Sequence, residues 1–386
     1  MSLFDYGVTA GQPSSAVFDA FAGNGTHPDA FAEVMYSINA KTAVCGALAK
    51  DALLQVLQGE ADPSRDAKLG ALLMGSTNIA TPEMIVGFVD AVGEFEGRDF
   101  AAEKPTVSDA DEMVVGCAGS GKKGRKTFNI STASMVVAAA AGGKTLKAGS
   151  HSASSLTGSS DILEAVGFTI PNTIEDSTTI LDQTNFGFYS IEDMVPRFNE
   201  VYGNRFFAPH ALSYALPALL IPVKVDTLLY GYAGPNIPLS AQALTNVGHT
   251  SVMVCNNTVD GVHYVDEMAT VGTTQIVGTQ DGAVGRTLQL DAADYLAIKD
   301  SQSVPSIDSH ATLSAQTEFF LALLGGEVPN SIAENTICLN AATMLYLGRQ
   351  CDNPKEGFAL ALETVRSGQA SSKLHDVVEA SRSLNG

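Results

Sequence analysis

The sequence has few basic residues for its length. Its 386 residues include 22 lysines and arginines against 42 aspartates and glutamates, which gives a formal net charge of −20. A surface this acidic repels nucleic-acid phosphates over most of its area, which argues against general nucleic-acid binding.

Long apolar runs and paired cysteines are also lacking. The most apolar stretches, Ser134–Gly143 and Ala211–Val225, are shorter than the ~18 residues of a membrane span. The opening residues MSLFDYG place no basic segment before an apolar run, so we expect no signal peptide. The five cysteines are scattered and form no C-x-x-C motif, which argues against a disulfide framework or a zinc site. We therefore expect a cytoplasmic protein.

The composition nevertheless suits a folded chain with a sizeable core. Hydrophobic residues make up 45% of the sequence and charged residues 17%, which excludes a largely disordered chain. At ~150 residues per domain, the length favours two domains. We find no internal repeat or low-complexity segment.

The hydrophobic pattern divides the chain near residue 109. Helical spacing dominates before it, as in DALLQVLQGE and in the helix that Thr81-Pro82-Glu83 begins, and no convincing strand precedes residue 110. From Glu112 onward strands, loops and helices alternate, which predicts an α/β domain with a central, mostly parallel sheet. We expect a helical domain over 1–108, joined by a helix-like segment at 183–222, and an α/β domain over 109–386.

A glycine-rich, basic loop follows the first predicted strand. Four of the 22 basic residues fall within positions 122–126, between Gly116 and a predicted helix at Ser131–Ala141. Glycines let backbone N–H groups wrap an anion, and a helix N-terminus attracts one. The pattern predicts an anion site, with a solvated surface turn as the alternative. Residues 116–123 nearly match a Walker A loop, but Lys123 stands where Ser or Thr is needed, which argues against an ATPase.

Two further polar clusters occur later. Residues 147–161 are rich in serine and glycine and lead into a predicted helix, which suits phosphate binding; a flexible serine linker is the alternative. Asp266 and Glu267 follow a predicted strand at Ser251–Cys255. Such a pair can hold magnesium on a pyrophosphate, or it can be a solvated acidic turn.

Together these stretches resemble the anthranilate phosphoribosyltransferase family, which has the nucleoside phosphorylase-like fold. The resemblance is carried by the order of glycine-rich loop, NIST, Lys-x-Gly with a serine run, GS-x-D-x-LEA-x-G, and then DE. Asn129–Thr132 and Gly158–Gly167 are its most specific parts, and it extends from about residue 45 to residue 375.

The resemblance implies a site for phosphoribosyl pyrophosphate and magnesium. The donor-binding residues that it implies are Gly116, Gly119, Lys122, Asn129, Ser131, Thr132, Lys147, Ser154, Ser155 and Ser159. The Mg²⁺ ligands that it implies are Ser131, Asp266 and Glu267.

The acceptor half departs from the family pattern. Lys-His-Gly-Asn is Lys-Ala-Gly-Ser here, so Ala148 and Ser150 replace a histidine and an asparagine, and Val195 replaces another histidine. Arg205 is the one loose candidate for the arginine that holds the anthranilate carboxylate. The expected acceptor pocket comprises Ala148, Ser150, Tyr189, Val195 and Arg205. Losing several polar contacts changes selectivity, so we predict that anthranilate is a poor substrate.

The predicted activity is transfer of ribose 5-phosphate from phosphoribosyl pyrophosphate to an aromatic or heterocyclic acceptor, with loss of pyrophosphate. The alternatives are a true anthranilate phosphoribosyltransferase of tryptophan biosynthesis, a nucleoside-phosphorylase-like enzyme, and a non-catalytic relative that binds a phosphorylated metabolite. No covalent nucleophile is evident; His151 could assist a proton transfer or be an ordinary hydrogen-bonded histidine. The resemblance and the apolar N-terminal helices also predict a homodimer, formed through those helices and residues 183–222.

Overall fold

The centre of the protein is a nine-stranded sheet. The computed structural model describes residues 29–107, 112–151, 157–280, 282–298 and 306–384. Its strands are β1 (Val114–Gly119), β2 (Lys144–Gly149), β3 (Phe186–Ser190), β4 (Thr227–Gly231), β5 (Val252–Thr258), β6 (Tyr264–Val265), β7 (Thr273–Gln280), β8 (Ala283–Val284) and β9 (Leu288–Leu290). They lie in the order β3-β2-β1-β4-β5-β7-β8, with β6 beside β5 and β9 beside β7. The neighbours from β3 to β5 pair in parallel and the later strands pair antiparallel, which confirms the predicted α/β class with a mostly parallel sheet.

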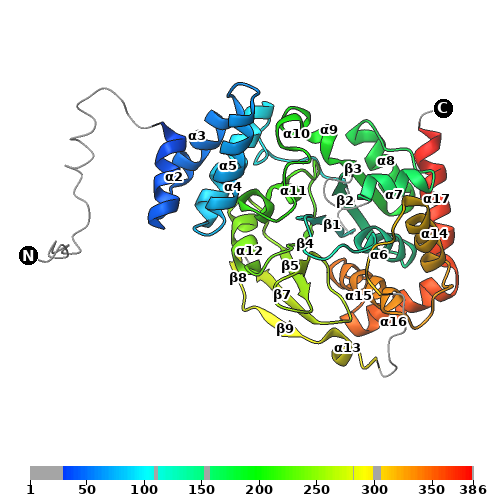
Figure 1. Ribbon diagram of the computed structural model, residues 1–386. Coiled ribbons are helices and arrows are strands. Elements are labelled where there is room, and N and C mark those ends of the chain that lie inside the picture. The colour runs from blue at the N-terminus through cyan, green and yellow to red at the C-terminus, as the bar shows by residue number, and fades with distance from the viewer. Residues whose placement is uncertain (1–28, 108–111, 152–156, 281, 299–305, 385–386) are drawn as a thin grey trace, which may run out of the picture.

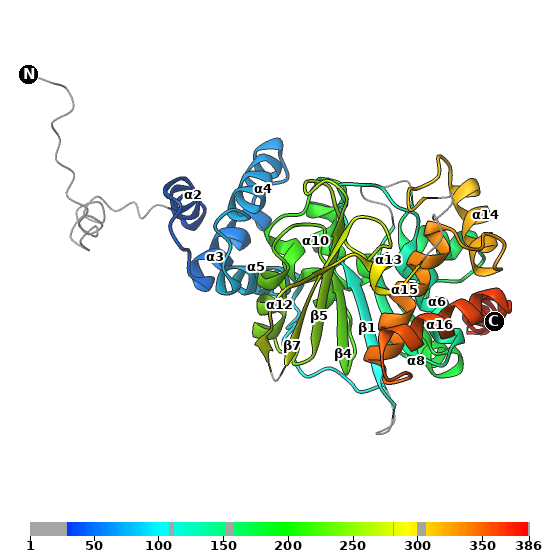
Figure 2. The same cartoon turned by 90° about the horizontal axis from the view of Figure 1, so that it is seen from below.

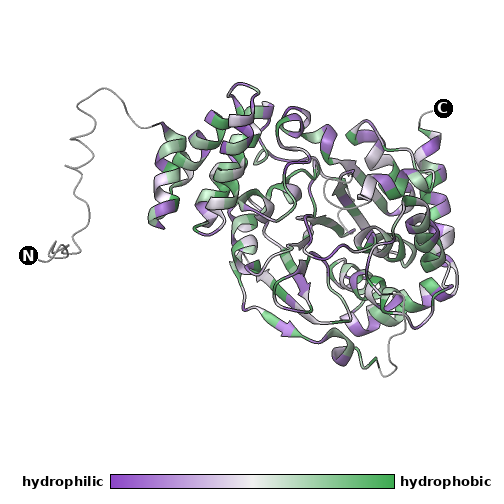
Figure 3. Ribbon diagram, in the orientation of Figure 1, coloured by the Kyte–Doolittle hydropathy of each residue, from purple (hydrophilic) through white to green (hydrophobic). Residues whose placement is uncertain are grey.

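A group of helices precedes the sheet. These are α2 (Ala30–Ala40), α3 (Gly46–Leu57), α4 (Pro63–Ser76) and α5 (Pro82–Glu96). The predicted start of α5 is confirmed, because the Thr81 hydroxyl accepts the Met84 N–H at 3.2 Å and Pro82 takes the first helical position. Helices α3 and α5 pack closely where Gly46 meets Gly87: a Cβ on Gly87 would lie 2.1 Å from the Gly46 carbonyl oxygen. Figure 3 shows hydrophilic residues on the outer sides of this group.

The two faces of the sheet are covered by different helices (Figures 1 and 2). One face carries α9 (Ile191–Met194), α10 (Pro196–Tyr202), η1 (Ala211–Tyr214), α11 (Leu216–Leu219) and α12 (Ile237–Asn246), and its buried residues form one core with the N-terminal helices. The other carries α6 (Ile130–Ala140), α7 (Ser159–Ala165), α8 (Ile174–Thr184), α14 (Leu313–Leu324), α15 (Ile332–Leu347), α16 (Pro354–Arg366) and α17 (Gln369–Ser383). A short helix, α13 (Ala292–Tyr295), follows β9. Within the described residues, no helix is both long and apolar enough to cross a membrane.

The segment 183–222 is only partly helical, which corrects the sequence prediction. Residues Phe186–Ser190 form β3 and pair in parallel with β2. Three of the five residues are aromatic and all five are buried, which suits a strand covered on both faces. Within the helical parts of the segment, α10 packs against α5, and η1 packs against α4 and α5. Residues 203–210, between α10 and η1, form neither helix nor strand. The predicted domain boundary near residue 108 lies outside the described residues and stays a prediction.

The parallel strands end at one edge of the sheet. The strand order reverses between β1 and β4, where the connections leave in opposite directions. Open α/β sheets bind ligands outside the carboxyl ends of their strands at such a reversal. The ends of β1, β2, β3 and β4 are therefore where a site is expected.

We predict that the protein forms a homodimer through the N-terminal helices and residues 183–222. Large apolar side chains are exposed in these segments: Tyr36 is 70%, Met74 41% and Phe207 82% exposed. Buried aromatic anchors carry much of the binding energy of an interface. Phe207→Glu should therefore weaken the dimer at least ~tenfold in sedimentation equilibrium.

Val262→Glu is the matched control for this prediction, because Val262 is 73% exposed but lies in the turn before β6. It should leave the dimer intact. A wild-type monomer at micromolar concentration would contradict the prediction.

Candidate active site

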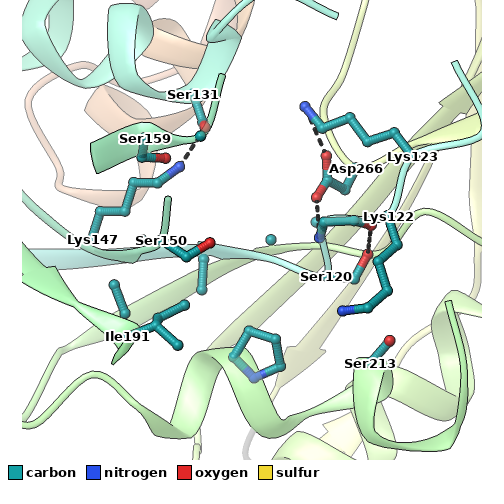
Figure 4. Close-up of a pocket in the computed structure, with 18 of the residues that line it drawn as sticks. Ser120, Lys122, Lys123, Ser131, Lys147, Ser150, Ser159, Ile191, Ser213 and Asp266 are labelled. Carbon is teal, nitrogen blue, oxygen red and sulfur yellow. Dashed lines mark hydrogen bonds and ion pairs between the residues drawn. The ribbon is translucent and has the colours of Figure 1, made fainter. Parts of the chain in front are cut away.

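A cavity of about 420 Å³ opens at the carboxyl ends of the parallel strands. The loops after β1, β2 and β3 and the Asp266–Glu267 pair after β6 form much of its wall. Figure 4 shows Lys147 of β2 directed at Ser131 and Lys123 of the loop after β1 directed at Asp266. One cavity thus joins the three polar clusters of the sequence.

Asp266 sits directly over the strand-order reversal. Gly119 ends β1 and pairs with Gly231, which ends β4. A Cβ on Gly119 would lie 2.5 Å from Asp266 Oδ2, and one on Gly231 would lie 1.7 Å from the Asp266 carbonyl oxygen. The Gly121 N–H also donates to Asp266 Oδ2 at 2.8 Å. Glycine at both strand ends is what lets this carboxylate approach the sheet.

Lys123 pairs with both acids. Its Nζ lies 3.1 Å from Asp266 Oδ1 and donates to Glu267 Oε1 at 2.5 Å and Oε2 at 2.7 Å. It also donates to Thr127 Oγ1 at 2.9 Å. The two acids are only 7% and 6% exposed, so the ammonium balances charge that water reaches poorly.

The charges of this cluster shift its pKa values. Burial favours neutral Lys123, but the charges of Asp266 and Glu267 outweigh it and raise the pKa of the ammonium. Burial also favours neutral Asp266, yet the Lys123 charge and hydrogen bonds lower the pKa of that carboxyl. Burial, reinforced by the Asp266 charge, raises the pKa of Glu267 against the opposing effect of Lys123. Lys123 and Asp266 therefore form a charged pair at neutral pH.

The loop after β1 is held in place along its length. Gly121 and Lys122 both have left-handed backbones, with φ of 59° and 54°. For a non-glycine residue such as Lys122 this conformation costs ~1–2 kcal/mol, which the surrounding structure must supply. Further along, the Gly124 N–H donates to the Tyr264 carbonyl oxygen at 2.9 Å, and Arg125 makes a two-point ion pair with Asp308 at 2.5 and 2.8 Å.

The four basic residues of this loop thus have different positions. Lys123 faces the acids, Lys126 lines the cavity, and Arg125 is paired with Asp308. Lys122 lies with its Nζ 4.9 Å from the centre of the Tyr202 ring. The sequence analysis assigned Lys122 to the donor, whereas the structure places it against the aromatic part of the cavity.

The donor half of the cavity is built on β2 and the start of α6. Lys147 is 7% exposed, and its Nζ donates to Ser131 Oγ at 2.6 Å. Burial lowers the pKa of Lys147. Asn129 ties the two loops together, because its Nδ2 donates to the Gly158 carbonyl oxygen at 2.9 Å. Ser159, at the first position of α7, also lines the cavity.

Two of the predicted donor residues do not line the cavity, and two others lie outside the described residues. Gly116 faces Val225, which a Cβ would approach to 2.9 Å, so packing rather than a ligand requires this glycine. Thr132 is buried in α6, where its hydroxyl has no hydrogen-bond partner among the described residues, and it is not part of the cavity wall. Ser154 and Ser155 lie outside the described residues. Gly119, Asn129, Ser131, Lys147 and Ser159 do line the cavity.

The other half of the cavity is apolar and aromatic. Phe198 stacks on Tyr202 with ring centres 4.7 Å apart, and Tyr202 stacks on Phe206 at 5.1 Å. All three rings line the cavity, together with Ile191, Val195, Leu212, Leu216, Pro217 and Leu220. The Tyr202 hydroxyl lies 2.8 Å from Nε2 of buried His210. Burial, with Lys122 nearby, lowers the pKa of His210, so a neutral imidazole holds the ring.

Three of the predicted acceptor residues line this half and two do not. Ala148, Ser150 and Val195 are part of the wall. Tyr189 is buried on β3 outside it, with its hydroxyl 3.4 Å from that of Thr178. Arg205 is turned away and pairs with Asp66 of α4 at 3.1 Å, so it is not available to a carboxylate in the cavity.

His151 and the cysteines of the cavity have no feature that indicates a direct role in catalysis. His151 lines the cavity, but its Nε2 lies 3.1 Å from Glu164 in a half-exposed pair. Burial raises the pKa of the Cys117 thiol to about 12 and that of the Cys255 thiol further, so neither is a nucleophile.

The predicted magnesium ligands meet at the cavity, but their oxygens already have partners. Asp266 and Glu267 accept from Lys123 and the Gly121 N–H, and Ser131 Oγ accepts from Lys147. A divalent cation needs several free oxygen ligands. In this arrangement the three residues do not fit one, because ammonium groups take those positions.

The sequence analysis did not identify the aromatic stack or the ion pair of Lys123. The four-residue spacing of Phe198, Tyr202 and Phe206 is typical of one helix face and could have indicated the stack. The ion pair of Lys123 with Asp266 joins residues 143 positions apart, so no local pattern indicates it.

Gly119→Ala tests whether the close approach of Asp266 organises the site. The added methyl group must displace the carboxylate or the strand end, so the free energy of unfolding should fall by ~1–3 kcal/mol. Chemical denaturation of the full chain measures this. Gly70→Ala in α4 is the control: a Cβ there meets nothing within 4 Å, and stability should not fall. Equal stabilities of Gly119→Ala and the wild type would contradict the packing argument.

Known proteins resemble this chain over most of its length. The model of a glycosyl transferase family, a/b domain, matches residues 111–371. Anthranilate phosphoribosyltransferase of Pyrobaculum arsenaticum is 33% identical over 304 residues, covering 78% of this chain and 85% of that protein. The enzyme of that name from Cupriavidus necator is 30% identical over 331 residues, covering 85% and 91%.

Solved structures agree on the fold. The anthranilate phosphoribosyltransferase structure from Thermus thermophilus matches with a TM-score of 0.67 at 23% identity, covering 90% of this chain and 99% of that one. The Saccharomyces cerevisiae enzyme in complex with PRPP (phosphoribosyl pyrophosphate) and Mg matches with a TM-score of 0.70 at 18% identity, covering 92% and 99%. With the family match over residues 111–371 and the curated relatives at about 30% identity, the chain belongs to this glycosyl transferase family and is an anthranilate phosphoribosyltransferase-like transferase.

Proposed function

We propose that this enzyme transfers the phosphoribosyl group of PRPP to the amine of anthranilate, with release of pyrophosphate. The observation that carries the proposal is a single cavity with a cationic, hydroxyl-rich half and an aromatic half. The names of the curated relatives support anthranilate over the other acceptors that the sequence left open. The proposal thus replaces the expectation that anthranilate is a poor substrate.

The donor half supports binding of a phosphorylated sugar. Lys126 and Lys147 bring positive charge, and Ser131 and Ser159 bring hydroxyl groups, next to the N-terminus of α6. Helix N-termini and buried ammonium groups both favour phosphate oxygens. In a chain of net charge −20, this half is a local exception that attracts an anionic donor.

The acceptor half supports an aromatic acid despite the loss of the expected arginine. The flat rings of Phe198, Tyr202 and Phe206 suit a planar ring, which stacks at 4.5–7 Å between centres. Lys122 places one ammonium group over this stack. We assign to Lys122 the contact with the acceptor carboxylate that the sequence analysis gave to Arg205.

The chemistry then depends on positioning and on charge. The acceptor nitrogen forms a bond to C1 of the ribose as the bond from C1 to the pyrophosphate oxygen breaks, and the nitrogen loses a proton to water. The transition state has oxocarbenium character and a highly charged leaving group. Fixed cations such as Lys147 stabilise the departing charge, and the apolar wall orients the ring. Magnesium enters only as a counter-ion of the donor's own phosphates.

The proposal includes the compartment in which the enzyme works. We place the enzyme in the cytoplasm, supported by five free cysteines that form no pairs in the structure.

A steady-state assay with PRPP and a panel of aminobenzoates and heterocycles tests the function. We expect anthranilate to be consumed with stoichiometric pyrophosphate at ~1 s⁻¹ or faster, the usual range for enzymes. Turnover with a different ring alone would overturn the acceptor assignment. The absence of pyrophosphate release with every acceptor would overturn the transfer itself.

Lys122→Met tests the carboxylate contact. A hydrogen bond to a charged group contributes ~1.5–3 kcal/mol, so the KM for anthranilate should rise by ~10–150-fold. The affinity for pyrophosphate, measured by calorimetry, should change less than ~twofold, because Lys122 faces the aromatic half.

Lys147→Met is the matched control, since it removes an ammonium group from the donor half. It should weaken pyrophosphate binding instead. An unchanged KM for anthranilate in Lys122→Met would contradict the assignment.

A further inference from the structure

The contacts of Lys123 distinguish it from the other lysines of the cavity. Its ammonium reaches Asp266 Oδ1 and both oxygens of Glu267 within 3.1 Å. The fourth carboxylate oxygen, Asp266 Oδ2, accepts the Gly121 N–H at 2.8 Å. Three of the four carboxylate oxygens therefore accept hydrogen bonds from groups of this loop, and the remaining one, Asp266 Oδ1, is buried beside the Lys123 ammonium as its ion-pair neighbour.

The surroundings fix this arrangement. Thr127 Oγ1 accepts from the Lys123 ammonium at 2.9 Å, and the side chain of Lys123 is only 20% exposed. The Arg125–Asp308 pair and the Gly124 hydrogen bond hold the backbone on the far side. The contacts of the loop thus fix the position of the Lys123 side chain beside the two acids.

We propose that Lys123 is a tethered cation that takes the place of a divalent metal ion at the Asp266–Glu267 pair. The proposal rests on the proposed function, in which pyrophosphate leaves from this cavity. The S. cerevisiae relative was solved with PRPP and Mg; here one positive charge is supplied by the chain itself. Pyrophosphate binding then does not require a metal on the acidic pair.

Replacing Lys123 with a neutral residue changes the environment of the acidic pair. Without Lys123, two buried carboxylates lie side by side without the ammonium that pairs with both of them, which is strongly unfavourable. Adjacent carboxylate oxygens are also the ligands that hard divalent cations prefer. Removal of the ammonium should convert the acidic pair into a metal site.

Manganese titration of the full-length protein, followed by electron paramagnetic resonance, tests this without any substrate. The wild type should show no binding at the acidic pair, whereas Lys123→Met should gain one site that is at least ~tenfold tighter than any in the wild type. Adding Asp266→Asn should abolish the gained site. Lys122→Met, which removes an ammonium group from the same loop but not from the acids, should behave as the wild type.

Tight manganese binding by the wild type that Asp266→Asn removes would overturn the proposal. So would a Lys123→Met protein that gains no site. If Lys123→Met folds only when manganese is present, that result supports the proposal; if it does not fold at all, the wild-type titration and Lys123→Arg, which should gain no site, decide the matter.

Calorimetry with pyrophosphate separates this inference from the proposed function. Wild-type affinity should fall less than ~tenfold when EDTA replaces Mg²⁺, whereas Lys123→Met should lose at least ~100-fold in EDTA and recover with Mg²⁺. Wild-type binding that vanishes in EDTA would overturn the tethered-cation proposal while leaving phosphoribosyl transfer intact. No binding under either condition would overturn the proposed function, and the manganese result would still decide the role of Lys123.

Discussion

The buried ion cluster of Lys123, Asp266 and Glu267 is the constraint on which the rest of the site depends. Asp266 lies against the glycine ends of β1 and β4, so the sheet fixes where the carboxylate can be. The carboxylate in turn fixes the loop after β1 through the Gly121 N–H and the Lys123 ammonium. The contact between Asp266 and the loop after β1 therefore sets the charge balance of the site, the backbone conformation of the loop and the position of its lysines.

That contact also divides the cavity. Because Lys123 turns toward the acids, its neighbour Lys122, in a left-handed conformation, turns toward Tyr202. Consecutive lysines thus serve opposite halves, one facing the pyrophosphate side and one facing the aromatic stack. The aromatic half is formed by α10 and the residues after it, which pack against the N-terminal helices. The helical region is therefore part of the site as well as a support for it.

Local patterns in the sequence predicted much of this structure. The run at Met113–Val115 and the Thr81-Pro82 start carry their own signals, so the first strand and α5 were predictable. The family resemblance located Asn129, Ser131 and Lys147 because these residues lie in compact motifs.

What the sequence could not predict depends on long-range pairing. Arg205 is the carboxylate partner that the sequence predicts, but the fold places Asp66 beside it. Tyr189 was expected to face the acceptor, but none of the residues of β3 lines the cavity, whose wall resumes at Ile191. The metal assignment for Asp266 and Glu267 assumed free oxygens, and no local signal in the sequence indicates that Lys123 lies against them.

The central claim is that Lys123, and not a metal ion, neutralises the acidic pair in the working complex. Anomalous diffraction from crystals grown with PRPP, anthranilate and Mn²⁺ tests it most directly. The account predicts the Lys123 ammonium between Asp266 and Glu267, with any manganese bound to the donor's phosphates alone. Manganese ligated by Asp266 and Glu267, with Lys123 displaced from them, would contradict it.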